Sequence, residues 1–571
     1  MTNSKRQVRH LTLSCAIFVV ALLALSGCKN QPDMLEAEKS IVYASSALVT
    51  PHPLSTQVGE TVLANGGNAV DAAVAIQFAM AVVYPRAGNL GCGGFMIYRS
   101  ADGDVKALDY RERAPAAANR DMYLDEAGEI IPDMSTFGHR AAGVPGTVAG
   151  IAAMYEEYGS MPWEDLIQPA IELARNGFPI TQTEIDRQLS QREKIARLNE
   201  SSPFLEDYSQ GALFVQPDLA TTLIRIRDGV SDGFYKGRTA ELIVEEMETG
   251  GGLISLADLE SYEASWREPI QCAYRDYQVY AMPPSSSGGV ALCQMLGMLE
   301  PFPLRDMGFQ SVQAGHATVE VMRRAYEDRA EYLGDTDYYP VPIDSILQAS
   351  YLADKMSSFS TDSATLSKPS AFGMDMETFE TTHISIVDAE GNAVSITTTL
   401  NSSYGCKVIV DGAGFFLNNE MDDFSSKPGV PNMFGLVGAE ANAIAPGKRM
   451  LSSMTPTIVT RGDELFMVLG TPGGSTIITS VLQLITNVVD YDMSLDSAVS
   501  QARFHHQWLP DSIQIEPEAF DAQTREQLSA LGHGFKVVKE IGKVKAIHRL
   551  PNGQLHAAAD PRHPDDDVGG F

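Results

Sequence analysis

Alternating apolar and polar positions mark two neighbouring runs in the second half of the chain, residues 382–387 and 393–400. Such alternation is typical of half-buried β-strands. Between the runs lies DAEGN, residues 388–392, a turn composition with glycine where a positive φ is most needed. The pattern therefore predicts an antiparallel hairpin centred on Glu390.

The predicted hairpin brings hydroxyl side chains together. Thr381 and Thr399 are equidistant from the turn and face each other, and Asn401 follows on the same face as Thr399. On pattern alone, a Thr pair at a strand start reflects β-propensity. Thr needs a base to act as a nucleophile, and His383 is fixed along the same strand. Cutting the chain before Thr381 frees an α-amine with a pKa of about 7.7–8.0, which suits a base near neutral pH.

The same kind of pattern predicts a second antiparallel hairpin, with strands at 455–460 and 465–470 around the turn at 461–464. It returns the serines at 452–453 beside the glycines at 473–474, which precede an apolar-periodic helix through Val489. Free N–H groups and the helix dipole converge at such a position and suit a developing oxyanion. A plain glycine-rich turn is the alternative.

The remaining patterns place helices around these hairpins. Residues 53–84 predict two helices, of which the second is apolar nearly all round and therefore buried. Strands are expected at 105–110 and 274–282, and residues 160–265 are helix-rich. PPSSSGG, which follows Met282, lacks the Lys-Ser/Thr pattern of a phosphate loop, and we expect it to close onto the sheet. Residues 355–372 are rich in Ser and Thr and are expected to be flexible.

Composition fits a globular protein. The 571 residues allow two to four ordinary domains or one large two-part sandwich, and a hydrophobic content of 44% supplies an ample core. The net charge of −31, without a basic run, argues against nucleic acid and other polyanionic partners. It identifies no substrate.

Residues 1–27 predict a targeting segment outside the fold, with basic residues ahead of an apolar run over 11–25. The run is short for a transmembrane anchor. Leu-Ser-Gly before Cys28 resembles a bacterial lipobox, and an ordinary secretory signal with an incidental cysteine is the alternative. Lys29 favours outer-membrane attachment, so we expect a lipid-anchored protein of the bacterial cell envelope, on the periplasmic side of the outer membrane.

Six cysteines are present. Cys15 lies in the targeting segment, Cys28 is the predicted lipidation site, and four others are widely scattered without metal-ligand spacing: Cys92, Cys272, Cys293 and Cys406. In an oxidising periplasm they can pair in an order that spacing does not reveal. Burial as small hydrophobic residues is the favoured state.

Many motifs in a fixed order resemble the γ-glutamyltranspeptidase family. TTH at 381–383, LNNEMDDFSSKPGVPNMFGLVG, RMLSSMTPTIV and GTPGGSTIITSVLQ resemble its small subunit. Upstream, NGGNAVDAAVA, GNLGCGGFM, YRERAPAAANRDMYLD and MPPSSSGG resemble its large subunit. The resemblance runs from about residue 41 to the C-terminus and is highly specific.

The resemblance implies an α+β fold, the four-layer α/β/β/α sandwich of N-terminal-nucleophile hydrolases. It also implies a precursor cut between Glu380 and Thr381. The products are a large subunit, residues 28–380 with a flexible tail from about 355, and a small catalytic subunit, residues 381–571. These two fragments form a heterodimer.

The implied activity is γ-glutamyl transfer and hydrolysis. Thr381 attacks the γ-amide of glutathione or a related compound, and the γ-glutamyl-enzyme is released to water or to an amino-acid or peptide amine. By resemblance, Thr399 orients the nucleophile, and Gly473 and Gly474 form the oxyanion hole. No cofactor is expected. His505 and His506, like the acidic run near the C-terminus, lack helical metal-ligand spacing, so no catalytic metal is expected either.

The resemblance assigns substrate binding to six residues, namely Arg111, Asn401, Glu420, Asp423, Ser452 and Ser453. Arg111 and the two serines bind the α-carboxylate, for which the planar guanidinium is suited; a surface ion pair with Glu112 is the ordinary alternative. Asp423 holds the α-ammonium, assisted by Asn401 and Glu420, where the family often has Gln. Phe434 stands in the lid loop, residues 425–438, where bacterial relatives often have Tyr.

Two rival functions remain. A cephalosporin or glutaryl acylase shares the fold and the nucleophile, but Arg111 and Asp423 argue against it because they match the two charges of an amino acid. An uncleaved peptide-binding lipoprotein is the rival of another class. The joint presence of TTH, Thr399 and the glycine pair argues against it.

Overall fold

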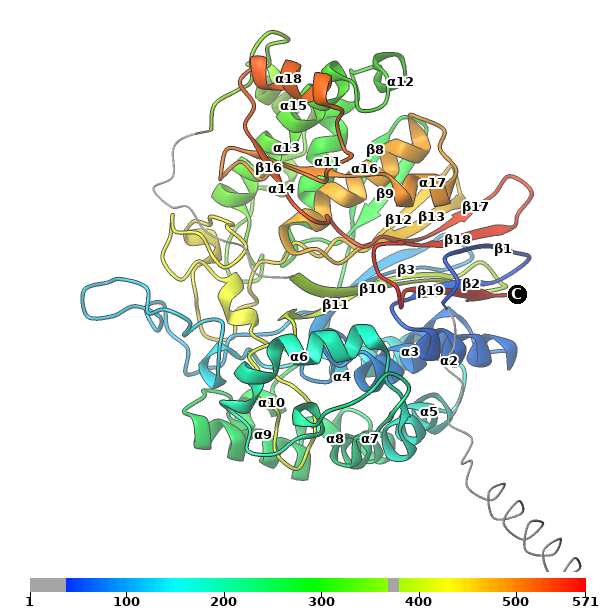
Figure 1. Ribbon diagram of the computed structural model, residues 1–571, viewed down its shortest axis with the longest axis vertical. Helices are drawn as coiled ribbons and strands as arrows, with labels where there is room; N and C mark the ends of the chain where they lie inside the picture. Colours follow the sequence, from blue (N-terminus) through cyan, green and yellow to red (C-terminus); the bar gives the residue numbers. More distant parts are fainter. Residues whose placement is uncertain (1–36, 368–378) are drawn as a thin grey trace, which may run out of the picture.

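Two seven-stranded antiparallel sheets lie face to face at the centre of the molecule, and helices cover the outer side of each (Figure 1). The layer order is therefore α/β/β/α, which confirms the fold predicted from the sequence. The computed structural model describes residues 37–367 and 379–571, so the predicted targeting segment and Cys28 lie outside it. Within those ranges, no helix has the length and apolar character needed to cross a bilayer.

The first sheet carries the predicted hairpin at its centre. Thr381 pairs with Thr399, as the spacing predicted, and the register shifts between Phe379 and Thr381. Such irregularities often lie beside active sites, and this one falls at the predicted cleavage point. The strand order across the sheet is β19 (Asp567–Gly570), β2 (Ala47–Thr50), β10 (Phe379–Val387), β11 (Ala393–Ser402), β3 (Gly93–Arg99), β4 (Val105–Tyr110) and β7 (Ser265–Arg267).

The second sheet contains the second predicted hairpin, β12 and β13, whose ends lie within two residues of the strands expected at 455–460 and 465–470. The strand order is β1 (Ser40–Tyr43), β18 (Leu555–Ala559), β17 (Lys545–Arg549), β13 (Glu464–Gly470), β12 (Thr457–Arg461), β9 (Tyr277–Ala281) and β8 (Ile270–Tyr274). Two small sheets accompany it, β14 (Phe504–His505) with β15 (Ile513–Ile515) and β16 (Phe535–Val537), and β5 (Phe178–Pro179) with β6 (Leu213–Phe214).

The pleat of the strands separates the apolar layers. On β3, Phe95 and Ile97 join Ile458 and Val468 in the cluster between the two sheets. Met96, which points the other way, packs with the helices. Alternate residues of one strand therefore fill two different cores.

The helices beneath the first sheet pack around α3, which is buried along its whole length as the sequence predicted. They are α2 (Pro53–Ala64), α3 (Ala69–Val83), α4 (Thr147–Tyr158), α5 (Trp163–Asn176), α6 (Gln182–Ala196), α7 (Pro217–Gly229), α8 (Asp232–Tyr235), α9 (Gly237–Gly250) and α10 (Leu256–Glu260). An Asn68–Asp71 capping box begins α3, which satisfies N–H groups that a helix start leaves open.

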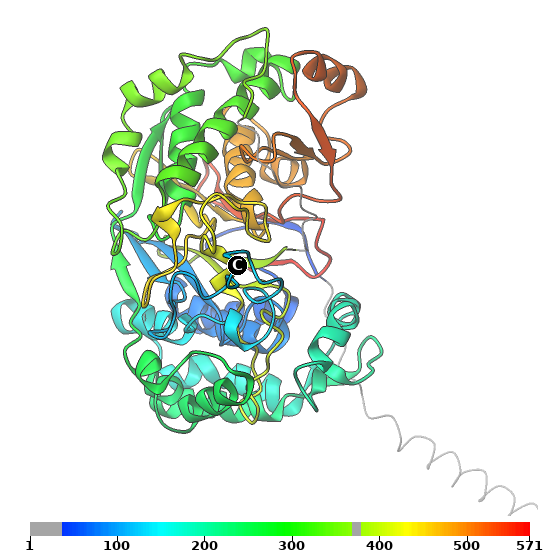
Figure 2. The same ribbon diagram turned by 90° about the vertical axis from the view of Figure 1, so that its left-hand side faces the viewer.

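The helices above the second sheet surround α13, whose last turns approach the pocket described below. They are α11 (Gly288–Leu299), α12 (Leu304–Met307), α13 (Val312–Tyr332), α14 (Ile343–Ile346), α15 (Ala349–Met356), α16 (Ile477–Val489), α17 (Leu495–Ser500) and α18 (Ala522–Ala530). Short 3-10 turns connect the layers, η1 (His139–Ala141), η2 (Pro203–Leu205), η3 (Glu420–Asp423), η4 (Glu440–Asn442) and η5 (Gly474–Thr476). Figure 2 shows the loops after β11 gathered at one side of the sandwich.

The cysteines correct one expectation. Cys272 on β8 and Cys293 on α11 form a disulfide, whereas Cys92 and Cys406 are free and buried. The sequence favoured unpaired, buried side chains over disulfides for all four, and this holds for only two of them. The two cysteines can pair because α11 packs directly on β8. Their separation of 21 residues in the sequence does not predict this contact.

The segment before the predicted cleavage site takes a defined path up to residue 367. Glu320 on α13 accepts hydrogen bonds from the N–H of Thr365 at 3.1 Å and from its hydroxyl at 2.5 Å. Asp511 accepts from the N–H of Ser367 at 2.8 Å. Residues 355–367 are thus anchored, unlike the flexible segment expected there. The rest of the expected tail lies mostly in 368–378, outside the described residues.

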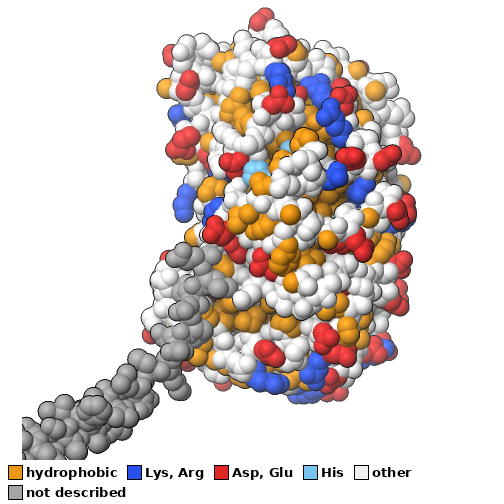
Figure 3. Space-filling view, turned by 90° about the vertical axis from the view of Figure 1, so that its right-hand side faces the viewer, with side chains coloured by type: hydrophobic (Ala, Val, Ile, Leu, Met, Phe, Trp, Pro, Cys, Tyr) orange, Lys and Arg blue, Asp and Glu red, His pale blue; other side chains and the backbone are white. Residues whose placement is uncertain are grey.

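Charged side chains are interspersed on the face that carries β1 and the C-terminus. On this face, Figure 3 shows Asp and Glu alternating with Lys and Arg over the surface. The excess of acidic residues is therefore spread over this side of the molecule and is not gathered in one field.

Candidate active site

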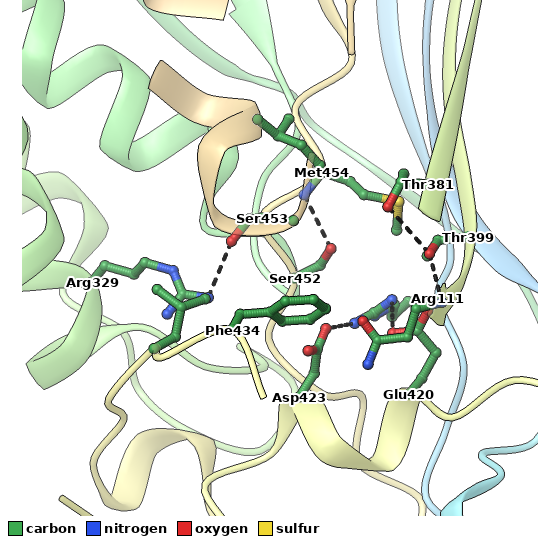
Figure 4. A pocket seen from close by; sticks show the side chains of 14 residues that line it. Arg111, Arg329, Thr381, Thr399, Glu420, Asp423, Phe434, Ser452, Ser453 and Met454 are labelled. Atoms are coloured by element: carbon green, nitrogen blue, oxygen red, sulfur yellow. Dashed lines mark hydrogen bonds and ion pairs between the residues drawn. The ribbon is translucent and has the colours of Figure 1, made fainter. Parts of the chain in front are cut away.

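A pocket lies where the ends of β10 and β11 meet the loops of the C-terminal half (Figure 4). Its lining contains the predicted nucleophile and Thr399, all six predicted substrate-binding residues, the lid residue Phe434 and Gly474. Residues far apart in the sequence, such as Arg111 and Gly474, therefore share one cavity.

The Thr pair forms one wall of the pocket. The Thr381 hydroxyl is 5% exposed and donates to Oγ1 of Thr399 across 3.3 Å, a long hydrogen bond. The N–H of Asn401 donates to the same Oγ1 at 2.7 Å. Asn401 has φ +77°, so the strand turns immediately after the pair. β10 begins at Phe379, so Thr381 lies two residues inside the strand.

The glycine pair follows β13 and faces the hairpin. Gly473 and Gly474 have φ of +144° and +54°, conformations that favour glycine. Gly474 lines the pocket, and η5 packs against β10. The sequence placed both glycines directly before a long helix, but η5 intervenes, because the chain makes a 3-10 turn before α16 begins at Ile477. The Tyr326 hydroxyl donates to the carbonyl of Ser475 and holds this turn.

Arg111 lies at the centre of a buried charge cluster. Its Nη2 donates to Oδ2 of Asp423 at 2.5 Å, and its Nη1 lies 2.7 Å from Oε2 of Glu420 and 3.5 Å from Oε2 of Glu112. Arg111, Glu112 and Glu420 are fully buried. The ordinary surface ion pair considered for Arg111 is therefore wrong. The expected partner of the substrate carboxylate is instead bonded to the expected partner of the substrate ammonium.

Burial dominates the electrostatics of this cluster. It raises the pKa of Glu112 to about 7 and raises the pKa values of Glu420 and Asp423, while the nearby Arg111 offsets part of each shift. For Arg111, burial disfavours the charged form, but the three carboxylates outweigh it and raise its pKa. One guanidinium thus faces three carboxyl groups, which cannot all be ionised without mutual repulsion.

The two serines are held by the loop that the sequence expected to close onto the sheet. The N–H of Ser287 donates to the carbonyl of Ser452 at 2.8 Å, and the N–H of Ser452 donates to the carbonyl of Ser285 at 2.9 Å. The hydroxyl of Ser286 donates to the carbonyl of Met454 at 2.6 Å. The PPSSSGG loop therefore supports the segment that carries the two serines.

The lid lies over the pocket. Phe434 is 4% exposed, and its carbonyl accepts from Nε2 of Gln507 at 3.1 Å. Gln507 Oε1 accepts from the Ser475 hydroxyl at 2.8 Å, so one amide connects the lid to the glycine turn. Nδ2 of Asn432 approaches Oδ1 of Asp423 at 3.5 Å. The lid is thus tied to both the catalytic and the charged sides of the pocket.

Sequence reasoning missed the residues that support the site from behind. Tyr326 and Arg329 lie outside the motifs that carried the resemblance, and no role was predicted for Gln507 or for Asn432 in the lid loop. Arg329 and Tyr326 resemble ordinary helix residues, and only the packing of α13 brings them to the pocket. His383, considered early as a base, bonds to Thr397 and Ser385 instead.

A group of possible metal ligands lies away from the pocket. Among the described residues, His316, Glu320 and His533 bring three such side chains together. Glu320 is already bonded to Arg324 and Thr365, and the two histidines bond to each other at 2.8 Å. These contacts give the group a structural role in holding the segment before the cleavage site.

The fold and the site together define a class. Two stacked antiparallel sheets between helical layers, with a hydroxyl residue near the start of a central strand and beside a pocket, are the architecture of N-terminal-nucleophile hydrolases.

Comparison with known proteins narrows the class to a family. The family model described as Gamma-glutamyltranspeptidase matches residues 55–570. The chain is 44% identical over 525 residues to the glutathione hydrolase proenzyme of Escherichia coli (strain K12), with 90% of each chain covered. The chain therefore belongs to the γ-glutamyltranspeptidase family, as the motifs indicated, and is an enzyme.

Solved structures include a similar member of this family. Gamma-glutamyltranspeptidase from Helicobacter pylori is 42% identical with a TM-score of 0.54, covering 58% of this chain and 95% of that one. Cephalosporin acylase from Bacillus halodurans superposes with a TM-score of 0.83 at 24% identity, covering 95% of this chain and 98% of that one. The second likeness shows the fold alone.

Proposed function

We propose that the protein is a self-cleaving γ-glutamyl transferase and hydrolase that acts on glutathione and related γ-glutamyl compounds. The observation that carries the proposal is the position of the Thr381 hydroxyl in one pocket with a paired acid and base, Asp423 and Arg111. A γ-glutamyl group carries an ammonium and a carboxylate, and both charges need a partner. The relative named glutathione hydrolase proenzyme supports the same substrate class.

Self-cleavage would use the same hydroxyl. In the proposed first step, Oγ1 of Thr381 attacks the carbonyl carbon of Glu380, the peptide C–N bond breaks, and the hydroxyl proton passes to the Thr381 nitrogen. Water then hydrolyses the resulting ester, which frees the Glu380 carboxylate and restores the hydroxyl. The register shift before Thr381 supports this step, because the backbone there is already displaced from regular pairing.

Turnover would begin with the α-amine that self-cleavage creates. This amine takes the proton from Oγ1 of Thr381 as the oxygen attacks the γ-carbonyl of the substrate. N–H groups of the Gly473–Gly474 turn would stabilise the oxyanion, and Thr399 would orient the hydroxyl. The amine returns the proton to the leaving nitrogen, and water or an acceptor amine then attacks the γ-glutamyl ester.

The Arg111–Asp423 pair suggests how the substrate is recognised. A γ-glutamyl group can insert its two charges between these side chains and exchange one ion pair for two. Binding energy from these remote charges positions the γ-carbonyl at Thr381. An acylase that takes glutaryl groups has no ammonium to bind, so Asp423 distinguishes the two activities.

Substitution of Asp423 tests this proposal. Asp423→Ala is expected to lower kcat/KM for a γ-glutamyl anilide by about 30- to 3,000-fold, since losing one partner of a buried charge pair costs roughly 2–5 kcal/mol. Self-cleavage should persist because it does not involve the ammonium. The comparison substrate is a glutaryl anilide, which lacks the α-amine. The wild type should prefer the γ-glutamyl anilide, and Asp423→Ala should reduce or reverse that preference.

Three outcomes would contradict the proposal. Wild-type preference for the glutaryl anilide would favour the acylase activity. Unchanged selectivity in Asp423→Ala would show that Asp423 does not bind the ammonium. An uncut chain without activity on either anilide would favour the peptide-binding lipoprotein.

We further propose that the protein is lipid-anchored in the bacterial cell envelope through Cys28. The lipobox-like end of residues 1–27 supports this location. Cys28→Ala is expected to abolish lipidation and release the protein from the membrane fraction, while the released protein keeps its γ-glutamyl activity. A wild-type protein recovered in the soluble fraction with its N-terminus beyond Cys28 would contradict the anchor.

A further inference from the structure

Arg329 is a second cation at the pocket wall, apart from the Arg111 cluster. It lies in the last turn of α13 and is 5% exposed. In Figure 4 it approaches Ser453 from the left, whereas Arg111 lies on the right beside Asp423. No motif assigned it a role.

The guanidinium of Arg329 holds both substrate serines. Its Nη2 donates to Oγ of Ser453 at 3.3 Å, and its Nε donates to Oγ of Ser287 at 3.0 Å. The Ser287 hydroxyl in turn donates to the carbonyl of Ser452 at 2.6 Å. One planar group therefore fixes the hydroxyl of one serine and, through a relay, the backbone of the other.

These bonds leave the hydroxyl protons of both serines available to donate. A guanidinium can only donate, so Oγ of Ser453 must be the acceptor and keeps its own proton. Oγ of Ser452 likewise accepts, from the N–H of Met454 at 3.1 Å. Among the described residues, neither hydroxyl donates to another protein group. Two O–H donors thus remain for an anion in the pocket.

The charges lead to the same conclusion. Arg111 is already surrounded by three carboxyl groups, so it offers little uncompensated positive charge to a substrate carboxylate. Within residues 37–367 and 379–571, Arg329 forms no ion pair, and burial lowers its pKa. Asp423 is near enough for its charge to offset part of that shift, but its carboxylate is bonded to Arg111. A buried charge without a bonded counter-ion is costly, and an anion bound at the two serines would lower that cost.

We propose that Arg329 is a positioning residue for the α-carboxylate of the substrate, which turns Ser452 and Ser453 into donors and places positive charge behind them. The inference rests on the proposed γ-glutamyl function. If Arg329 has this role, the enzyme should prefer substrates with a free α-carboxylate over the corresponding α-carboxamides.

The test compares two substrates that differ only at this group, a γ-glutamyl anilide and its α-carboxamide counterpart. Arg329→Met is expected to lower kcat/KM for the carboxylate substrate by about 10- to 100-fold, the usual range for hydrogen bonds to a charged group. The loss should appear mainly in KM. Activity on the carboxamide should stay within about twofold, since a neutral amide gains little from the charge. Arg329→Lys, which keeps the charge but not the planar fork, should recover part of the loss.

Each outcome decides the matter. Equal losses of kcat/KM on both substrates would mean that Arg329 only stabilises the structure. No loss on either substrate would mean that Arg329 does not contribute to binding. Either result overturns the inference. A denaturing gel first establishes that each variant is cut. If Arg329→Met is not cut, Ser287→Ala interrupts the relay alone, and its loss should still be selective for the carboxylate substrate; an unselective loss overturns the inference. A wild-type enzyme without γ-glutamyl activity would instead contradict the proposed function, and this appears before any variant is compared.

Discussion

At the scale of single residues, the site combines a weak nucleophile with a dense set of buried charges. The Thr381–Thr399 pairing could be predicted because strand spacing fixes which side chains face each other. Arg111 and Asp423 could be assigned only through family resemblance, since nothing in their spacing brings them together. Arg329 could not be predicted, because the direction of a lone arginine near a helix end depends on how the helix packs.

The carboxyl group of Glu112 predicts a pH dependence of stability. Burial raises its pKa to about 7 from an ordinary value of 4.5. Between these values the folded protein keeps the proton and the unfolded chain loses it, so the contribution of Glu112 to stability falls as the pH rises from about 4.5 through 7. Between pH 5 and 8, the free energy of unfolding of Glu112→Gln should therefore fall less than that of the wild type.

The measurement is the urea midpoint of both proteins at each pH. The matched control is Glu126→Gln, which replaces an exposed glutamate and should keep the wild-type pH dependence. If Glu112→Gln keeps the wild-type slope as well, the buried carboxyl group is not the cause.

At the scale of secondary structure, alternation and turn composition predicted both central hairpins, with strand ends within three residues of those observed. The strand expected over 274–282 corresponds to β9, and the preceding strand β8 was missed. The turn between them is made by Arg275, at φ +52°, and Asp276, and it contains no glycine or proline to mark it. The disulfide that joins β8 to α11 was missed for a related reason, because it depends on which helix covers the sheet.

The disulfide predicts a redox dependence of stability. Cys272 and Cys293 close a loop with a separation of 21 residues, for which the entropic stabilisation is about 3 kcal/mol. Reduction should therefore lower the denaturation midpoint of the wild type. The double variant Cys272→Ala/Cys293→Ala should start lower and should not respond to the reductant. A wild type with the same midpoint in both conditions would show that the bond contributes nothing.

At the scale of the whole molecule, the two predicted fragments are interleaved. In the first sheet, β10 and β11 of the small fragment lie between β2 and β3 of the large one. In the second sheet, the small fragment supplies β18, β17, β13 and β12 between β1 and β9. A cut before Thr381 therefore leaves both cores assembled, and the fragments should separate only in denaturant. This interleaving could not be predicted from sequence order, since strand neighbours are set by the sandwich as a whole.

The central claim is that the Thr381 hydroxyl cuts the chain before itself and becomes the catalytic N-terminus. The most direct measurement is the intact mass of the purified protein under denaturing conditions, for the wild type and for Thr381→Ala. The wild type is expected to give two fragments, the smaller spanning residues 381–571 with a free Thr381 amine, and Thr381→Ala is expected to remain one inactive chain. Two fragments from Thr381→Ala, or a wild-type small fragment that begins at another residue, would contradict the account.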